Sequence, residues 1–289
     1  MDHEWRPRRT VLITVTLLGL LVLGVLLMGV FSGRWTIDPV AVSLGPVSIH
    51  WYGLIIASAI LMALPWVVQR AERRGLDRST VERVLWWAVI GGVLGARLVF
   101  VVQNLDYFGA HLGRILALVD GGLSIHGAIL GGAVALRVTL GFDRQNFWRV
   151  MDAAVPGLLL GMILGRFGNL ANAELFGPPT NQPWKLFIPE VARPPGLEAV
   201  AFYHPTFLYD ALLNAALLAG LLWIERRWSL APGRLTLFFL IGIAATRFTV
   251  EFWRLGSSVL VGLSLAQLVS VVIALVASLG LWLRRSMRP

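Results

Sequence analysis

The sequence contains no cysteine and few charged residues. Only 14% of its 289 residues are Asp, Glu, Lys or Arg, against about 25% in an average soluble domain. The absence of cysteine excludes a disulfide framework, a cysteine-ligated metal and an internal thiol nucleophile. Apolar residues replace the charges, since 57% of the chain is hydrophobic and the mean hydropathy is +0.73. This composition is typical of a polytopic membrane protein.

Apolar runs long enough to cross a bilayer core, which needs about 20 residues, occur eight times. They lie at 11–31, 51–69, 84–104, 123–140, 150–170, 205–224, 234–252 and 263–283. We therefore expect an all-α, polytopic helical membrane protein with about eight transmembrane helices. The first run follows a basic stretch, as in a signal peptide, but it exceeds the roughly 7 to 15 apolar residues usual there. We predict that residues 1–32 form an extra, retained N-terminal helix and that residues 33–289 form one membrane-embedded domain.

Positive charges indicate how the helices are oriented. With the N-terminus inside, inner loops hold the positive residues of 6–9, 70–83, 137–149, 226–234 and 284–288, and outer segments hold only Arg34, Arg114, Lys185, Arg193 and Arg254. The positive-inside rule then places both termini in the cytoplasm. The net charge of +9 does not indicate a nucleic-acid partner, because the arginines neither form one patch nor alternate with aromatic residues.

The two longest connections between the predicted helices both fall on the outer side. They cover about 104–122 and 171–204, and the second is rich in proline. Neither has transmembrane periodicity. We expect them to form small extracytoplasmic caps.

Ionisable residues also fall inside the predicted spans. Arg166, Arg247 and Glu251 would each cost about 2.5 to 3.5 kcal/mol at mid-membrane, so they must face each other, a wet cavity or an anionic ligand. One interpretation is structural, with Arg166 paired to Glu251 or Arg247 paired to Glu174. The other is an anion site, because guanidinium groups match phosphate oxygens bidentately. The spacing of Arg247, Glu251 and Arg254 stacks all three on one helix face.

The stretch GRFGNLANAELFG at 165–177 concentrates polar residues at the end of an apolar run. On a helix with about 100° per residue, Arg166 and Asn169 share a face, whereas Asn172 and Glu174 fall on other sides. We therefore expect the helix to end or bend near Ala171 and to turn these polar side chains inward.

Two further polar residues occupy predicted helices. Arg97 could pack against Asp152 or Asp210, and His126 lies about one turn inside the membrane boundary, where a lone histidine is more often a packing residue. Glycines at four-residue spacing predict close helix packing; they are Gly91 and Gly95, Gly127 and Gly131, and Gly157, Gly161 and Gly165.

Aromatic residues occur at the outer interface. Tyr52, His204 and Tyr209 lie where tyrosine and histidine commonly anchor helices. The sequence has no HExxH pair, acidic cluster with metal spacing, GxSxG elbow or GxxxxGK loop. We expect no metal and no cofactor.

Five motifs carry a resemblance to a known family. In sequence order, SLGPVSIHWYGL, GGLSIHGAILGG, GRFGNLANAELFG, YHPTFLYDAL and RFTVEFWR resemble those of the prolipoprotein diacylglyceryl transferase family of bacterial inner membranes. The resemblance runs from about Ile37 to the C-terminus, and the GRxGNxxNxExxG block is the signature of the family. It implies that the diacylglyceryl group of phosphatidylglycerol moves to the lipobox cysteine thiol of a prolipoprotein signal peptide, which releases glycerol phosphate.

The resemblance also implies roles for individual residues. His126 matches the proposed base, and Arg166 and Arg247 would stabilise the leaving phosphate. The residues expected to bind substrate are Tyr52, Arg97, Asn169, Asn172, Glu174, Gly177, His204, Tyr209 and Glu251. Expected partners are phosphatidylglycerol, prolipoprotein signal peptides and membrane lipids.

The chain departs from the family pattern at several positions. Ala128 replaces the last glycine of HGG, Phe207 and Asp210 replace glutamine and glutamate of HPSQLYE, and Phe100 stands where a tyrosine is usual. Family members commonly have seven spans with an outside N-terminus. Residues 11–31 add one span, which preserves the orientation of everything after it.

Two alternatives belong to other functional classes. A membrane anion transporter or channel would be lined by Arg97, Arg166 and Arg247, and it predicts charges at several depths. Here the charges gather toward one side. A noncatalytic relative that binds phospholipid is compatible with the departures, but the intact signature disfavours it.

Overall fold

The computed structural model describes residues 6–45, 47–117, 121–141, 143–256, 259–260 and 262–286. Each predicted apolar run coincides with a helix; these are α1 (Arg6–Phe31), α2 (Trp51–Glu72), α3 (Arg78–Gln103), α5 (Ile125–Thr139), α6 (Arg144–Ala171), α7 (Thr206–Arg227), α8 (Arg234–Val250) and α9 (Leu265–Ser286). In the described part of the chain, six of them are long and apolar enough to cross a membrane, whereas α1 and α5 carry shorter apolar stretches. The polytopic helical fold is thus confirmed, and the number eight stays a prediction.

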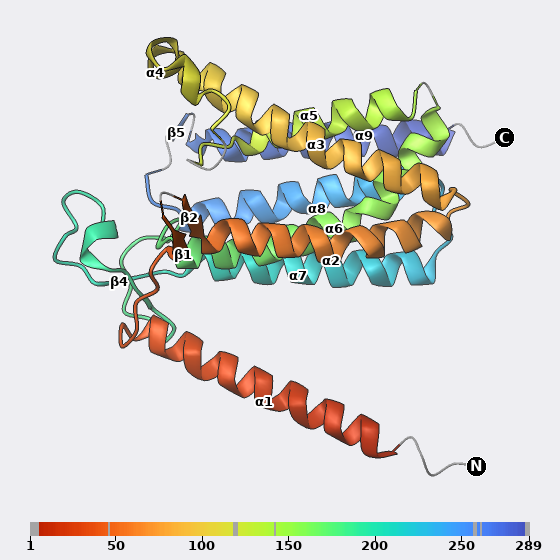
Figure 1. Cartoon of the computed structure of the whole chain (residues 1–289). Helices are drawn as coiled ribbons and strands as arrows, with labels where there is room; N and C mark the ends of the chain where they lie inside the picture. Colours follow the sequence, from red (N-terminus) through yellow and green to blue (C-terminus); the bar gives the residue numbers. More distant parts are fainter. Residues whose placement is uncertain are drawn as a thin grey trace.

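Short elements gather at one end of the helix bundle, which we call the strand end (Figure 1). They are β1 (Val40–Leu44), β2 (Val47–His50), α4 (Leu105–Ala110), β3 (Leu186–Phe187), β4 (Phe202–Tyr203), β5 (Val259–Leu260), β6 (Leu263–Ser264) and three 3-10 turns at Leu112–Arg114, Glu190–Ala192 and Glu251–Trp253. The strands form three antiparallel pairs, β1 with β2, β3 with β4 and β5 with β6. The connections from α2 to α3 and from α7 to α8, and the end of α9, lie at the opposite end.

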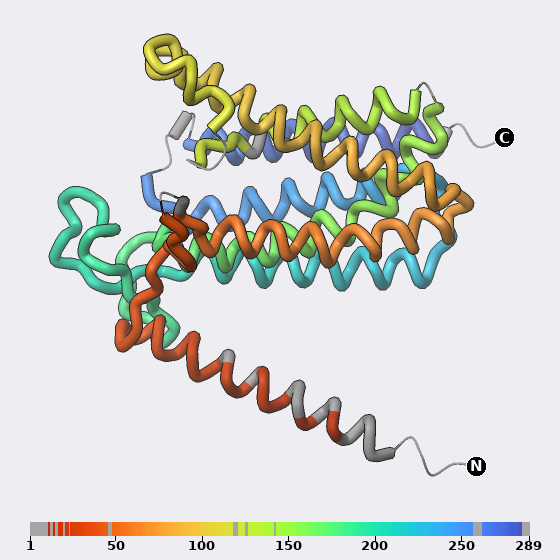
Figure 2. The backbone as a smooth tube through the Cα atoms, in the orientation of Figure 1, coloured from red at the N-terminus to blue at the C-terminus, as the bar shows by residue number. Residues whose placement is uncertain are grey.

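Two longer connections, after α3 and after α6, follow separate paths at the strand end (Figure 2). The segment between α3 and α5 forms α4 and a 3-10 turn, and the segment after α6 carries β3 and β4. These are the two regions predicted to form caps.

Helix packing follows the glycine pattern of the sequence. A side chain at Gly95 would meet the backbone oxygen of Gly127, and one at Gly91 would meet the backbone of Gly131. The backbones of α3 and α5 therefore approach closely, as small residues permit in membranes. The other extensive contacts join α2 to α6, α6 to α7, α7 to α8 and α8 to α9.

Among the described side chains of helix α1, those of the last turns pack against the rest of the protein. Leu27, Val30 and Phe31 join a cluster around buried Leu186 and Ile188 in the segment that follows α6. Farther back, Leu17, Leu21 and Val25 are exposed, and α1 leans away from the bundle (Figure 1). A membrane would surround this apolar surface with lipid.

Charged residues also hold the bundle together at the end opposite the strands. Arg70 of α2 bonds the Glu225 carboxylate of α7 at 2.6 Å and the backbone oxygen of Ala153 at 3.3 Å. Arg74 bonds the other oxygen of Glu225. We call Arg70, Arg74 and Glu225 the closed arginine cluster, because acceptors within the protein engage both arginines.

A buried carboxylate caps α8 from a neighbouring helix. Asp152 of α6 accepts hydrogen bonds from the backbone N–H of Gly233 at 2.6 Å and of Thr236 at 2.8 Å, and from the Thr236 hydroxyl at 2.6 Å. The first N–H groups of a helix have no partner within it. Asp152 supplies those partners across the helix boundary.

Candidate functional site

Helix α6 ends inside the signature block and the chain then turns back. The helix stops at Ala171, as predicted. Ala173 and Leu175 follow with φ of 50° and 55°, a region that non-glycine residues seldom adopt. The backbone N–H of Glu174 bonds the oxygen of Asn169 at 3.0 Å, which fixes the turn.

This turn brings the polar side chains of the block together. Asn169 Nδ2 donates to Glu174 Oε1 at 2.9 Å, and Asn172 Nδ2 donates to the same oxygen at 3.3 Å. Asn169 Oδ1 in turn accepts from Arg166 Nη1 at 3.3 Å. The predicted gathering of Arg166, Asn169, Asn172 and Glu174 is therefore confirmed as geometry.

The carboxylate partner of Arg166 is Asp210 of α7. Arg166 Nη2 lies 2.8 Å from Asp210 Oδ2, and the carboxylate is only 6% exposed. The structural interpretation that paired Arg166 with Glu251 is therefore wrong. Arg166 Nε is buried and has no hydrogen-bond partner among the described residues. A buried donor without an acceptor costs about 1 to 3 kcal/mol, so this edge of the guanidinium needs an explanation.

Helix α8 supplies the second arginine with its own carboxylate. Arg247 Nη2 lies 3.1 Å from Glu251 Oε2, and Arg254 Nη1 lies 3.7 Å from the same oxygen. The predicted common face of these three residues is confirmed, whereas the suggested pairing of Arg247 with Glu174 is wrong. The Arg247 side chain is 32% exposed and that of Glu251 only 6%.

Electrostatics connects the two pairs. Burial lowers the pKa of Arg254, the charges of Arg247 and Arg166 lower it further, and those of Glu251 and Asp210 oppose the change. All five ionised groups therefore lie in one electrostatic neighbourhood, which we call the open arginine cluster. The sequence analysis placed Arg254 on one face with Arg247 and Glu251 but did not count it among the site residues. It considered Asp210 only as a neighbour of Arg97.

Three aromatic side chains surround the start of α7. Tyr209 Oη lies 2.9 Å from His204 Nδ1 and accepts a hydrogen bond of 2.7 Å from Trp184 Nε1. The Tyr209 ring also makes an edge contact with Trp253, 6.1 Å between centroids. Tyr209 precedes Asp210 in α7, and Trp184 joins the segment after α6 to Tyr209.

Two glycines permit close approach around this site. A side chain at Gly168 would overlap the ring of Tyr52, which comes from α2. A side chain at Gly177 would meet the Trp253 carbonyl and His204. Tyr52 therefore packs against the end of α6, and Gly177 packs against the start of α7 and the end of the α8 segment.

Arg97 is held by another part of the structure. It donates to the carbonyl oxygens of Ile115 at 2.7 Å, Arg114 at 2.6 Å, Gly121 at 2.7 Å and Gly122 at 3.0 Å. It contacts neither Asp152 nor Asp210, so the suggested packing against them is wrong. Its substrate-binding role stays a prediction. His126 lies in the first turn of α5, and its side chain is outside the described part of the structure.

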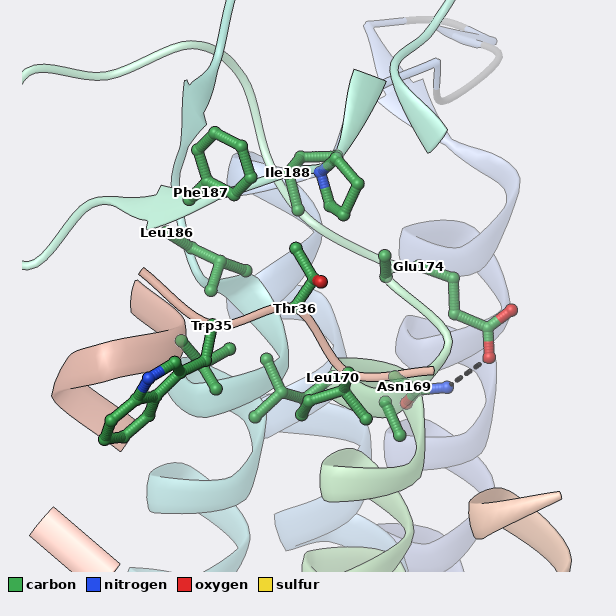
Figure 3. Close-up of a pocket in the computed structure, with 13 residues that line it drawn as sticks. Trp35, Thr36, Asn169, Leu170, Glu174, Leu186, Phe187 and Ile188 are labelled. Carbon is green, nitrogen blue, oxygen red and sulfur yellow. Dashed lines mark hydrogen bonds between the residues drawn. The ribbon is translucent and has the colours of Figure 1, made fainter. Parts of the chain in front are cut away.

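A cavity separates the signature from the end of α1 (Figure 3). Trp35 and Thr36 line one wall, Leu186 and Phe187 another, and the hydrogen-bonded pair of Asn169 and Glu174 lies at its edge. Its free space is about 20 Å³, which suffices for a water-sized group. It is too small for a phospholipid headgroup.

The fold and the open arginine cluster define a class of protein, namely a polytopic helical membrane protein with arginines paired to buried carboxylates at one end of the bundle. Residues 39–283 match the family described as prolipoprotein diacylglyceryl transferase. The chain belongs to this family.

Curated relatives agree with the family match. A phosphatidylglycerol–prolipoprotein diacylglyceryl transferase of Thermosynechococcus vestitus is 41% identical over 241 residues, 83% of this chain and 90% of the relative. Proteins of the same name from Synechococcus elongatus and Gloeobacter violaceus are 41% and 39% identical, covering 84% and 89% of this chain and 86% and 97% of the relatives. Residues 6–38 lie outside the family match.

Proposed function

We propose that this chain transfers the diacylglyceryl group of phosphatidylglycerol to the lipobox cysteine thiol of bacterial prolipoproteins and releases glycerol phosphate. Family membership and the names of the relatives support the reaction. The observation that carries the proposal is the open arginine cluster. Its arginines are anchored by buried carboxylates, and the buried Arg166 Nε is left for an acceptor from a ligand.

The proposed step is a displacement at the glycerol carbon that bears the phosphate. The thiolate forms a carbon–sulfur bond, the carbon–oxygen bond to phosphate breaks, and the phosphate monoester leaves with the electron pair. Arg166 and Arg247 stabilise the charge that grows on it, which is preorganised electrostatic catalysis. Asp210 and Glu251 orient the two guanidinium groups and take no part in proton transfer.

The thiol must lose its proton before it attacks, because the thiolate is the nucleophile. His126, in the first turn of α5, is the proposed base. If His126→Gln retains near wild-type turnover of a lipobox peptide, His126 is a packing residue and not the base.

The proposed location is the bacterial inner membrane, with both termini in the cytoplasm. The strand end then faces outward, and the segments at 104–122 and 171–204 cover the outer surface as caps. Signal peptide and phospholipid both enter sideways from the bilayer, and surrounding membrane lipids contact the apolar helix faces. We propose residues 1–32 as an added anchor and 33–289 as the transferase domain.

The remaining predicted residues complete the proposed substrate site. Asn169, Asn172, Glu174 and Gly177 shape the turn beside Arg166. Tyr52, Arg97, His204, Tyr209 and Glu251 are the other proposed binding residues. Because the donors of Arg97 are engaged by backbone carbonyls, a line of arginines through the membrane is disfavoured, and with it the channel alternative.

Mass spectrometry tests the proposal directly. Purified protein is incubated with phosphatidylglycerol and a lipobox peptide, and the thioether product is quantified. Arg166→Ala and Arg247→Ala should each lower product formation by about 100-fold or more. Arg78→Ala is the matched control, because this arginine is 67% exposed and pairs with Glu82 at the opposite end.

Two outcomes contradict the proposal. Wild-type protein that binds phosphatidylglycerol but forms no thioether would be a noncatalytic relative. Full turnover by folded Arg166→Ala and Arg247→Ala variants would place the chemistry elsewhere.

A further inference from the structure

A line of buried polar side chains runs from Arg166 across α7 to α8. Asp210 binds Arg166 through Oδ2, and its Oδ1 accepts from Asn214 Nδ2 at 2.8 Å. Asn214 Oδ1 accepts from the Thr246 hydroxyl at 3.2 Å. Asn214 is 0% exposed and Thr246 9%. The line therefore joins three helices inside the bundle.

The carboxylate fixes the direction of every hydrogen bond in this line. Asn214 must turn its NH₂ group toward Asp210, because its carbonyl oxygen would repel a carboxylate. Its oxygen then faces Thr246, which donates. The Thr246 hydroxyl also lies 3.0 Å from the backbone oxygen of Ile243, so its one proton is shared between two acceptors.

Helix packing alone does not require the hydrogen-bonded side chains of Asp210, Asn214 and Thr246. Leucine at position 214 would have no polar group to desolvate, and hydrogen bonds between polar side chains of membrane helices contribute little to stability on average. The line instead ends on the residue directly before Arg247. It thus connects Asp210, which holds Arg166, to the helix backbone that carries Arg247.

We infer that Asn214 and Thr246 are positioning residues for diacylglyceryl transfer. They hold the Asp210 carboxylate in one orientation, so that the Arg166 guanidinium keeps a fixed place relative to Arg247. This inference rests on the proposed function. Both residues act through Asp210 and touch no substrate, and their loss lowers kcat more than it raises KM for phosphatidylglycerol, since the defect lies in transition-state geometry.

The pair Thr246→Val and Thr246→Ser gives the first test, because valine conserves the volume and serine conserves the hydroxyl. Loss of a hydrogen bond of ordinary strength predicts a kcat about three- to tenfold lower for Thr246→Val. Thr246→Ser should stay within about twofold of wild type. Thr249→Val is the control, because the Thr249 hydroxyl on the same helix bonds the backbone oxygen of Ala245 at 2.9 Å and no side chain in the described part of the structure.

Asn214→Leu gives the second test, since it removes the bond to a charged group. We expect kcat to fall about ten- to 100-fold. The double variant with Thr246→Val should be no slower than Asn214→Leu alone, because Thr246 acts through Asn214. The thermal midpoint in detergent identifies folded protein, and the conservative Thr246 pair retains the test if Asn214→Leu fails to fold.

The outcomes separate this inference from the proposed function. Wild-type kcat in folded Thr246→Val overturns the inference, as does equal loss in Thr246→Val and Thr246→Ser. If Arg166→Ala abolishes thioether formation while these variants are unaffected, only the positioning role is wrong. If Arg166→Ala itself retains turnover, the proposed site is wrong and the inference falls with it.

Discussion

Arginines and carboxylates meet at both ends of the helix bundle, but in different proportions. At the end opposite the strands, Arg70 and Arg74 converge on Glu225, and Arg70 also binds a backbone carbonyl. At the strand end, Asp210 binds Arg166, and Glu251 is shared by Arg247 and Arg254. There the buried Nε of Arg166 has no hydrogen-bond partner within the described chain.

The comparison separates two uses of charge inside a membrane. Arg97 resembles the closed cluster, since four carbonyl oxygens accept from it. Donors that are bonded within the protein stabilise helix contacts and have little left to offer a ligand. A buried guanidinium donor without a partner carries an energetic cost, and a phosphate oxygen would remove it. An arginine whose N–H groups are bonded within the protein is therefore structural, whereas one with an unbonded buried N–H group is a candidate for ligand binding.

Removal of Glu225 should break the closed cluster with the largest effect on stability. Glu225→Ala leaves two arginines near each other without their carboxylate and removes two partly buried ion pairs, which should cost about 1 to 3 kcal/mol. Thermal unfolding in detergent should show a lower midpoint, with unchanged turnover per folded molecule. Glu82→Ala is the control, because its pair with Arg78 is exposed and such pairs contribute little. An unchanged midpoint for Glu225→Ala would remove the structural role.

Neutralising Glu251 in the open cluster should lower turnover more than stability. Glu251→Gln keeps the size of the side chain but weakens its hold on Arg247, and we expect turnover about ten- to 100-fold lower. The thermal midpoint should fall less than in Glu225→Ala. If Glu251→Gln loses much stability but forms thioether at a near wild-type rate, Glu251 has a structural role like that of Glu225. The two arginine clusters would then not differ in function.

Substitution of Thr236 should have the smallest effect, and it tests the end of the bundle opposite the strands. Thr236→Val removes one of the three hydrogen bonds to Asp152, which should cost about 1 kcal/mol. Thr236→Ser keeps the hydroxyl and should unfold as wild type does. Neither variant should change turnover; a turnover defect in Thr236→Val alone would show that the site depends on this cap.

The helices could be predicted from sequence because each needs a long apolar run, which is a local property. The end of α6 at Ala171 followed from the phase of Arg166 and Asn169 against that of Glu174. The carboxylate partner of Arg166 could not be predicted in this way, since the choice between Asp210 and Glu251 depends on how α6, α7 and α8 are rotated about their axes. Those rotations result from packing between distant segments.

Motif resemblance indicated the reaction but not the support behind the motifs. Asn214 and Thr246 belong to apolar helices and read as ordinary span residues. Their role comes from the hydrogen bond of Asn214 to Asp210 and that of Thr246 to Asn214. The hydrogen bond from Trp184 to Tyr209 likewise joins residues 25 apart in the chain, and no periodicity predicts it.

The cap that Asp152 places on α8 has a consequence for the order of synthesis. Its carboxylate leaves the ribosome 84 residues before Thr236, the residue that gives it two of its hydrogen bonds. Until Thr236 has been made, the acid lacks these donors. The start of α8 then gives Asp152 its hydrogen-bond donors and receives acceptors for its own first turn, so one contact completes the bonding of two helices made at different times.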